Sequence, residues 1–166
     1  ALAAGGEPLR IGSLLSVTGP AAFLGEDMKA GLELGVEEIN AAGGINGQMI
    51  EWTFYDVESQ TQKAITATRR LINQDKVDVI VSGGNMSGIA LAIAPLAETA
   101  KVPFISSEGA MAIVNPVEER QWVFKATVDD NEVLERIADY FEKQGITKVA
   151  LLADTSGFGQ GAVTQM

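Results

Sequence analysis

The stretch LRIGSLLSVTGPAAFLGEDMKAGLELGVEEINAAGGING, residues 9–47, decides the fold because it contains a strand, a turn, a helix and a helix stop in one unit. Residues 9–15 are too apolar to have a wet face, which is typical of a strand inside a parallel sheet. Thr18-Gly19-Pro20 breaks this strand, and glycines 43 and 44 are free to take the left-handed conformation that ends a helix. The helix between them has one apolar face, formed by Met28, Leu32, Val36 and Ile39. The stretch therefore predicts a β–α unit whose polar loop follows the carboxyl end of the strand, where open α/β sheets hold small ligands.

Strands and helices continue to alternate along the chain. The sequence pattern predicts strands at residues 50–55, 77–81, 102–106 and 122–126, with helices at about 60–74 and 89–100 between them. The last of these helices is apolar nearly all round, so we expect it to be the most buried, with a kink or a late start caused by Pro95. Residues 9–126 thus predict an α/β lobe with an open parallel sheet and helices on both faces.

The pattern starts again after residue 126. Asp129-Asp130 can cap a helix whose apolar stripe is Val133, Leu134, Ile137, Ala138 and Phe141. Residues 148–153 then predict another central strand, and only a few residues of a following helix remain. We expect a fragment in three parts: a disordered N-terminal remnant at residues 1–8, whose small residues resemble an export-signal cleavage site, a ligand-binding lobe at 9–126, and a crossover with the truncated beginning of a second lobe at 127–166.

Composition excludes several classes of function. The chain of 166 residues has 12 basic and 22 acidic residues, and a net charge of −10 disfavours binding to nucleic acid. Cysteine and histidine are both absent, which removes Cys–His and Ser–His–Asp catalysis, thiolate or imidazole zinc sites and haem ligation by histidine. We therefore expect no metal and no cofactor. No apolar run approaches the roughly 20 residues that cross a bilayer.

Four polar, glycine-containing loops follow predicted parallel strands, at residues 16–25, 82–88, 106–110 and 154–161. Right-handed crossovers bring such loops to one edge of their sheet. Each loop alone could be a tight turn, but four together favour a ligand cleft. Glu108 is either a ligand contact or a solvated turn residue, and Phe158 is suited to stack on a ligand. The adjacent pairs Glu37-Glu38, Glu118-Glu119 and Asp129-Asp130 are expected on solvated surface, the last as a helix cap.

One motif indicates a different class of protein. Residues 157–162, GFGQGA, fit the G-x-G-x-x-G/A fingerprint that follows a strand in dinucleotide-binding folds. The acidic residue expected about twenty positions later would lie beyond residue 166. A nucleotide-binding α/β enzyme is therefore kept as an alternative.

Five segments together carry a resemblance to a known family. They are Val17-Thr18-Gly19-Pro20 with Gly25, the run EINAAGGING at residues 38–47, Tyr55-Asp56, Pro103-Phe104-Ile105-Ser106, and SGFGQG at residues 156–161. They resemble the periplasmic solute-binding proteins of the branched-chain amino acid (Leu/Ile/Val) ABC transporter family. The resemblance extends from Leu9 to the end of the chain, and the NAAGGING run is its most specific part.

The resemblance implies a non-catalytic protein of two α/β lobes that trap a small molecule and dock on an ABC permease in the membrane, in a periplasmic or other extracytoplasmic location. The pocket positions of the family fall on Leu24, Asn85, Met86, Ser87, Glu108, Gly109, Ala110 and Phe158. Amino-acid binders have Tyr, Ser and Thr where this chain has Leu24, Asn85 and Ala110. The resemblance therefore favours a hydrophobic or aromatic carboxylate, with a branched-chain amino acid also open. Asn85, Ser87 and nearby backbone N–H groups are expected to hold the carboxylate, and Leu24, Met86 and Phe158 to enclose the apolar part. A ligand-sensing domain of a receptor or regulator is the other alternative.

Overall fold

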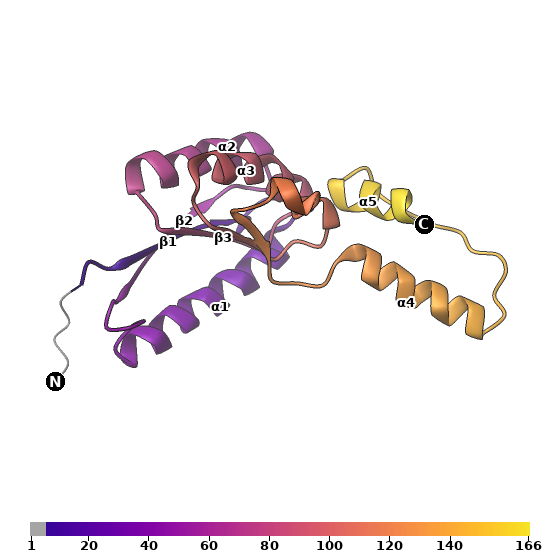
Figure 1. Ribbon diagram of the computed structural model, residues 1–166, viewed down its shortest axis with the longest axis horizontal. Coiled ribbons are helices and arrows are strands. Elements are labelled where there is room, and N and C mark those ends of the chain that lie inside the picture. The colour runs from indigo at the N-terminus through magenta and orange to yellow at the C-terminus, as the bar shows by residue number, and fades with distance from the viewer. Residues whose placement is uncertain (1–5) are drawn as a thin grey trace.

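Five parallel strands form one sheet in the order β2-β1-β3-β4-β5 (Figure 1). The structure is a computed structural model that describes residues 6–166, so the expected remnant at residues 1–8 lies largely outside the described residues. The strands are β1 (Leu9–Leu15), β2 (Ile50–Asp56), β3 (Val79–Ser82), β4 (Phe104–Ser106) and β5 (Val123–Lys125). Ile11 of β1 pairs with Trp52 on one side and with Val79 on the other, which places β1 inside the sheet. The predicted open parallel sheet is confirmed.

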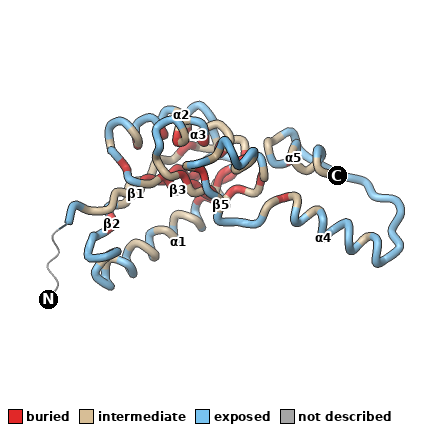
Figure 2. Tube along the Cα trace, in the orientation of Figure 1, coloured by how far each residue is buried: buried red, intermediate tan, exposed pale blue. Residues whose placement is uncertain are grey.

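Helices cover both faces of this sheet (Figure 1). Helix α1 (Ala22–Ala41) lies on one face, and α2 (Thr61–Arg70) and α3 (Ser87–Ala100) lie together on the other. A π-helical turn, Leu71–Asp75, continues α2, and the short 3₁₀ turns Met111–Ile113 and Val117–Glu119 connect β4 to β5. Figure 2 shows that the buried residues concentrate in the sheet and against α3. Phe104, Ile80, Leu14 and Leu71 are among the fully buried side chains of this core.

The run EINAAGGING at residues 38–47 forms the end of α1 and the turn that follows it. The chain turns back through Gly43 and Gly44, both at positive φ, and a side chain at Gly44 would overlap the backbone of Gln48. The side-chain amide of Asn40 then bonds both backbone groups of Ile50: its Nδ2 donates to the carbonyl oxygen at 3.0 Å, and its Oδ1 accepts from the amide at 2.7 Å. The run therefore ends α1 and attaches its last turn to the start of β2.

Two expectations about helices need adjustment. Helix α3 is the most buried helix, as predicted, but it starts at Ser87 rather than Ile89 and continues through Pro95. The prediction that α3 starts late was therefore wrong. The missing N–H of Pro95 costs one helical hydrogen bond but does not end the helix. The apolar face of α1 is only partly covered: Met28, Leu32 and Val36 are half-buried, and Ile39 is exposed.

The second half of the chain differs most from expectation. Helices α4 (Asp130–Lys143) and α5 (Gly157–Gln165) form, but residues 148–153 make no strand, and Leu152 is 99% exposed. The strand prediction was wrong because no neighbouring strand in residues 6–166 satisfies the backbone of this segment. The predicted stripe on α4 is also uncovered, with Val133 and Ile137 exposed. Figure 2 shows the α4–α5 connection as exposed along its length.

Helix α5 nevertheless contacts the first lobe. It packs against both α3 and α4, and Gly157 lies against Gly88 at the start of α3. This contact brings the loop before α5 to the carboxyl edge of the sheet. Within residues 6–166, no helix is both long and apolar enough to cross a membrane.

Candidate functional site

A cavity of about 560 Å³ lies at the carboxyl ends of β1, β3 and β4. Seven of the eight residues predicted for a pocket line it: Leu24, Asn85, Met86, Ser87, Glu108, Gly109 and Phe158. The eighth, Ala110, is buried at 2% exposure and does not line the cavity. The sequence analysis missed Phe23, Met28, Gly84, Ser107, Asp154 and Ser156 as lining residues. These residues belong to the same four loops or, for Met28, to the helix that follows the first loop. That position in the sequence was the signal that could have identified them.

A second, larger hollow of about 720 Å³ runs along α4. It is lined by the uncovered stripe of that helix, including Val133, Ile137 and Phe141. This hollow is away from the strand ends and has no link to the four loops. The smaller cavity is therefore the candidate site.

Asn85 lines the cavity, but its side-chain amide bonds to other parts of the protein instead of projecting toward a ligand. Its Nδ2 donates to the Leu14 carbonyl at 2.7 Å and to Ser82 Oγ at 3.2 Å, while its Oδ1 accepts from the Ser16 hydroxyl. The side chain is 7% exposed. Because both ends of the amide are used within the protein, it ties the loop after β3 to β1. The expected direct role of the Asn85 side chain in holding a ligand carboxylate does not fit this geometry.

The first turn of α3 offers backbone donors to the cavity. Met86 occupies the N-cap position, and no side chain caps this helix. The first N–H groups of a helix have no partner within the helix, and they attract anions. Ser87 begins the helix, and its Oγ accepts from the backbone N–H of Ala110 at 3.3 Å. The start of α3 is thus joined to the loop after β4 at the edge of the cavity.

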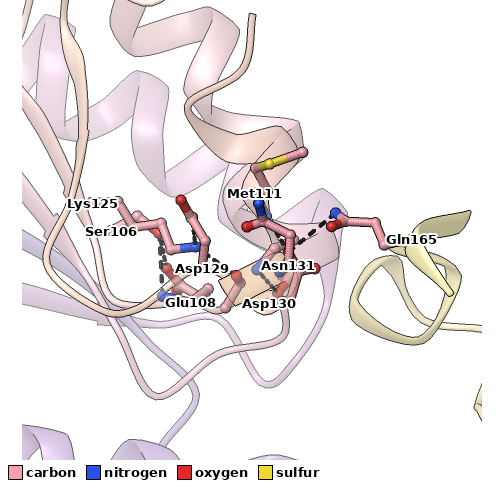
Figure 3. Close-up of polar contacts among 11 residues, drawn as sticks. Ser106, Glu108, Met111, Lys125, Asp129, Asp130, Asn131 and Gln165 are labelled. Carbon is pink, nitrogen blue, oxygen red and sulfur yellow. Dashed lines mark hydrogen bonds and ion pairs between the residues drawn. The ribbon is translucent and has the colours of Figure 1, made fainter. Parts of the chain in front are cut away.

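Glu108 is a buried carboxyl group in that loop, with 4% exposure. Ser82 Oγ donates to its Oε1 at 2.8 Å. The Ser106 hydroxyl donates to its Oε2 (Figure 3). Burial raises the pKa of Glu108 above its ordinary value, although both serine hydroxyls act in the opposite direction. The reading of Glu108 as a solvated turn residue is therefore wrong.

The large apolar side chains that line the cavity are partly exposed to solvent. The ring of Phe158 covers Gly109, where an added Cβ would lie 2.9 Å from a ring carbon, yet Phe158 remains 50% exposed. Leu24 and Met86 are also exposed, at 43% and 40%. Three large apolar side chains with open faces around one cavity can bury the apolar body of a small molecule.

Asp154 adds a second carboxylate at the rim. Its Oδ1 accepts from the backbone N–H of Ser156 at 2.9 Å and from the Ser156 hydroxyl at 2.5 Å. The hydroxyl is the larger cause that lowers the pKa of Asp154. Ser156 also caps α5, because its Oγ accepts from the Gly159 N–H at 3.2 Å. The rim residue is therefore ionised and fixed by the turn that begins α5.

The pair Asp129-Asp130 lies between the lobe and the second half of the chain (Figure 3). Asp129 pairs with Lys125 and makes no capping bond to α4, and Lys125 Nζ also donates to the Gly109 carbonyl at 2.5 Å. Asp130 is 5% exposed, and its Oδ1 accepts from Met111 N at 3.1 Å and from Gln165 Nε2 at 3.3 Å. The expectation of a solvated pair is wrong for Asp130, whereas Glu37-Glu38 and Glu118-Glu119 are exposed as predicted.

Residues 8–166 match the family model described as periplasmic binding protein. The chain belongs to the periplasmic binding protein family. Members of this family bind solutes and are not enzymes, and membership implies an extracytoplasmic location. The nucleotide-binding enzyme kept as an alternative is therefore overturned, and the GFGQGA motif also lacks the preceding strand that its fingerprint requires.

Relatives agree with this membership. The chain is 32% identical to Leu/Ile/Val-binding protein homolog 7 of Brucella abortus, over 96% of this chain and 42% of that protein. It resembles a solute-binding protein of an ABC transporter from Rhodopseudomonas palustris, solved with 3,4-dihydroxybenzoic acid (TM-score 0.84, 27% identity, 95% of this chain and 42% of that one). It also resembles a branched-chain amino acid transporter substrate-binding protein of Streptococcus pneumoniae, solved with isoleucine (TM-score 0.79, 28% identity, 95% and 45%). The chain thus spans less than half the length of these relatives.

In residues 6–166, no group of three or more acidic side chains is arranged to hold a metal ion. The polar chemistry of this periplasmic binding protein at its cavity is that of hydroxyls, backbone N–H groups and two carboxyls.

Proposed function

We propose that this chain is part of the extracytoplasmic solute-binding component of an ABC importer. Its ligand is a small hydrophobic or aromatic carboxylate or a branched-chain amino acid, held between two lobes. The observation that carries the proposal is the cavity at the carboxyl edge of the sheet, bounded by an uncapped helix start on one side and open apolar side chains on the other. Residues 9–126 are the first ligand-binding lobe, and residues 127–166 are the crossover and the beginning of the second.

The ligand carboxylate is held by the backbone N–H groups at the start of α3, with Ser87 beside them. Leu24, Met86 and Phe158 pack against the apolar part of the ligand. Asn85 acts indirectly, because its amide fixes the loop that presents the α3 start. Glu108, Gly109 and Ala110 form the opposite loop, in which Ala110 contributes its backbone N–H to Ser87 instead of a side chain to the cavity.

The two ligand types come from the relatives: isoleucine for the protein from Streptococcus pneumoniae and 3,4-dihydroxybenzoic acid for that from Rhodopseudomonas palustris. The resemblance favours a carboxylate without an ammonium group, since Ala110 stands where amino-acid binders have Thr, but Ala110 does not line the cavity, so a branched-chain amino acid also stays open. Binding is completed when the second lobe closes over the cavity, and an ABC permease in the membrane is the partner that recognises the closed form. The location is the periplasm or its equivalent.

Thermal-shift and calorimetric titrations with 3,4-dihydroxybenzoate and with L-isoleucine test this function on the purified protein in the full length that its gene encodes. We expect one of the two to raise the unfolding temperature and to bind with one-to-one stoichiometry. Phe158→Ala is expected to weaken binding about tenfold or more, since it removes buried apolar area from the site. Phe124→Ala is the matched control, because Phe124 has 51% exposure and lies outside the cavity. Failure of both compounds and of related acids to bind, or an equal effect of the two variants, would contradict the proposed site.

A further inference from the structure

Glu108 is a buried acid that has no cation for a partner. It is 4% exposed, and no Lys or Arg in residues 6–166 forms an ion pair with it. Its two hydrogen-bond partners are the hydroxyls of Ser82 and Ser106, at the carboxyl ends of β3 and β4. Burying an ionised carboxylate without a cation is costly, and hydroxyl partners offset only part of that cost.

These hydroxyl partners accommodate either protonation state of Glu108 with no change beyond the rotation of one hydroxyl group. A serine oxygen donates one hydrogen bond and can also accept, so it can donate to a carboxylate or accept from a carboxylic acid. Ser82 Oγ also accepts from Asn85 Nδ2 at 3.2 Å, which fixes its own hydrogen toward Glu108 Oε1. A proton taken from solvent therefore sits on Oε2 and points to Ser106 Oγ, whose hydroxyl hydrogen turns away. The site is built so that one proton can be added in place.

Among the described residues, the charged groups near Glu108 do not neutralise the negative charge of its carboxylate. The ammonium group of Lys125 on β5 bonds to the Glu108 loop, but its partners there and beyond are the Gly109 carbonyl and Asp129. Asp130 at the start of α4 and Asp154 before α5 are both acidic, and Asp154 lines the same cavity. The cavity therefore has two carboxyl groups and neither Lys nor Arg among its described lining residues.

The anion site of the proposed function is connected to Glu108 through intermediate hydrogen bonds. The start of α3 is bonded to the Glu108 loop through Ser87 Oγ and Ala110 N, and Asn85 reaches Glu108 through Ser82. A ligand carboxylate at this helix start would thus place a second negative charge beside a buried acid. Two neighbouring carboxylates that share a site favour protonation of one of them.

We propose that Glu108 takes up a proton when an anionic ligand enters the cavity, so that ligand binding is linked to pH through this side chain. The inference rests on the proposed function. Burial already raises the pKa of Glu108 in the empty site, and the ligand charge raises it further. At a pH between the two pKa values, about one proton is bound with each ligand. In that same range affinity falls by up to tenfold for each pH unit, and above both values it levels off because no proton is taken up. Glu108 thereby selects against anions at high pH and favours their capture under acidic conditions.

Calorimetry in buffers of different ionisation enthalpy tests this directly, because the observed binding enthalpy then depends on the number of protons taken up. The probe is 3,4-dihydroxybenzoate, titrated between about pH 5 and pH 8, where only its carboxyl group is ionised. We expect uptake of up to about one proton per ligand in the full-length protein. Glu108→Gln is expected to abolish this uptake and to flatten the pH dependence of the affinity. The controls are Glu118→Gln, an exposed acid far from the cavity, and Asp154→Asn at the rim, and both should retain the uptake.

A further variant covers the case in which Glu108→Gln fails to fold. Ser106→Ala removes a hydroxyl that donates to Glu108, so the pH range of proton uptake should move upward. Binding of 3,4-dihydroxybenzoate without proton uptake, or uptake that persists in Glu108→Gln or disappears only in Asp154→Asn, would overturn the proposal and leave the solute-binding function intact. Binding of L-isoleucine but not of 3,4-dihydroxybenzoate would also overturn the proposal and leave the solute-binding function intact. Failure of every acid to bind would overturn the function and the inference with it.

Discussion

Gly25 in the first turn of α1 lies directly against the carbonyl oxygen of Ser16, so closely that a Cβ at Gly25 would overlap it. The contact lets the helix begin immediately beside the end of β1, where Leu24 meets the cavity. It also explains why a glycine follows the Thr-Gly-Pro turn at this distance. The position of the first cavity loop therefore requires a residue without a Cβ at position 25.

Gly25→Ala is expected to destabilise the protein by about 2 kcal/mol or more, because neither backbone segment can move without shifting a buried strand. Gly31→Ala is the control in the same helix, since a Cβ there meets nothing within 4 Å. That control should stabilise the helix by about 0.5–1 kcal/mol. Chemical denaturation of the two variants measures both effects. Similar stabilities for the two would contradict the proposed close approach.

Asn85→Ala should cost about 2–3 kcal/mol of folding free energy, because the Leu14 carbonyl and the Ser16 hydroxyl lose a buried partner. Ligand affinity should fall as well, since the loop before α3 is no longer tied to β1. Asn73→Ala, on an exposed turn, is expected to change the unfolding free energy by less than about 0.5 kcal/mol. Loss of affinity without loss of stability would indicate that Asn85 contacts the ligand directly instead.

Glu108 is expected to make stability depend on pH in a definite direction. Because its pKa is raised in the folded protein, the unfolded chain releases this proton first as pH rises. Folding stability is therefore complete below the ordinary pKa of a glutamic acid and decreases as pH rises toward the raised value. Glu108→Gln should lack this decrease, so its stability relative to the natural protein improves with increasing pH. Denaturation at a series of pH values measures the difference, and an opposite slope would refute the assignment.

Asn40→Ala is expected to destabilise the protein by about 1–2 kcal/mol, since the amide and carbonyl of Ile50 both lose a hydrogen bond. The effect should appear in hydrogen exchange as faster exchange of the Ile50 amide at the start of β2. Glu38→Ala, exposed on the same helix, serves as the comparison. Equal exchange in the two variants would show that the Asn40 side chain does not attach α1 to β2.

The sequence predicted the first lobe well because each element there is specified locally and reinforced by its neighbours. Residues 9–15 are mostly apolar, with Arg10 and Ser13 as the exceptions, and glycines occur where the backbone turns through positive φ, as at Gly44. The convergence of the first three cavity loops followed from the parallel arrangement of the strands, whereas the loop before α5 reaches the cavity through the contact of α5 with α3. Seven of eight suggested pocket residues therefore line one cavity, although their contacts with a ligand stay a prediction.

Side-chain roles were less predictable, because they depend on partners distant in sequence. Asn85 was expected to face a ligand, but its partners Leu14 and Ser16 lie about 70 positions earlier. Glu108 is buried because Ser82 and Ser106 end neighbouring strands, which its own loop does not reveal. Local pattern also failed for residues 148–153, since an apolar run forms a strand only where another strand supplies hydrogen bonds.

That unpaired run, KVALLA, has a consequence for handling the protein. It has the apolar, β-forming composition of segments that add to the open edge of another sheet, and Val149 and Leu151 are exposed together with Leu152. We expect the chain of 166 residues on its own to aggregate through this segment at high concentration, and its net charge of −10 to slow the process at low ionic strength. A lysine in place of Leu152 would act as a gatekeeper against such self-association.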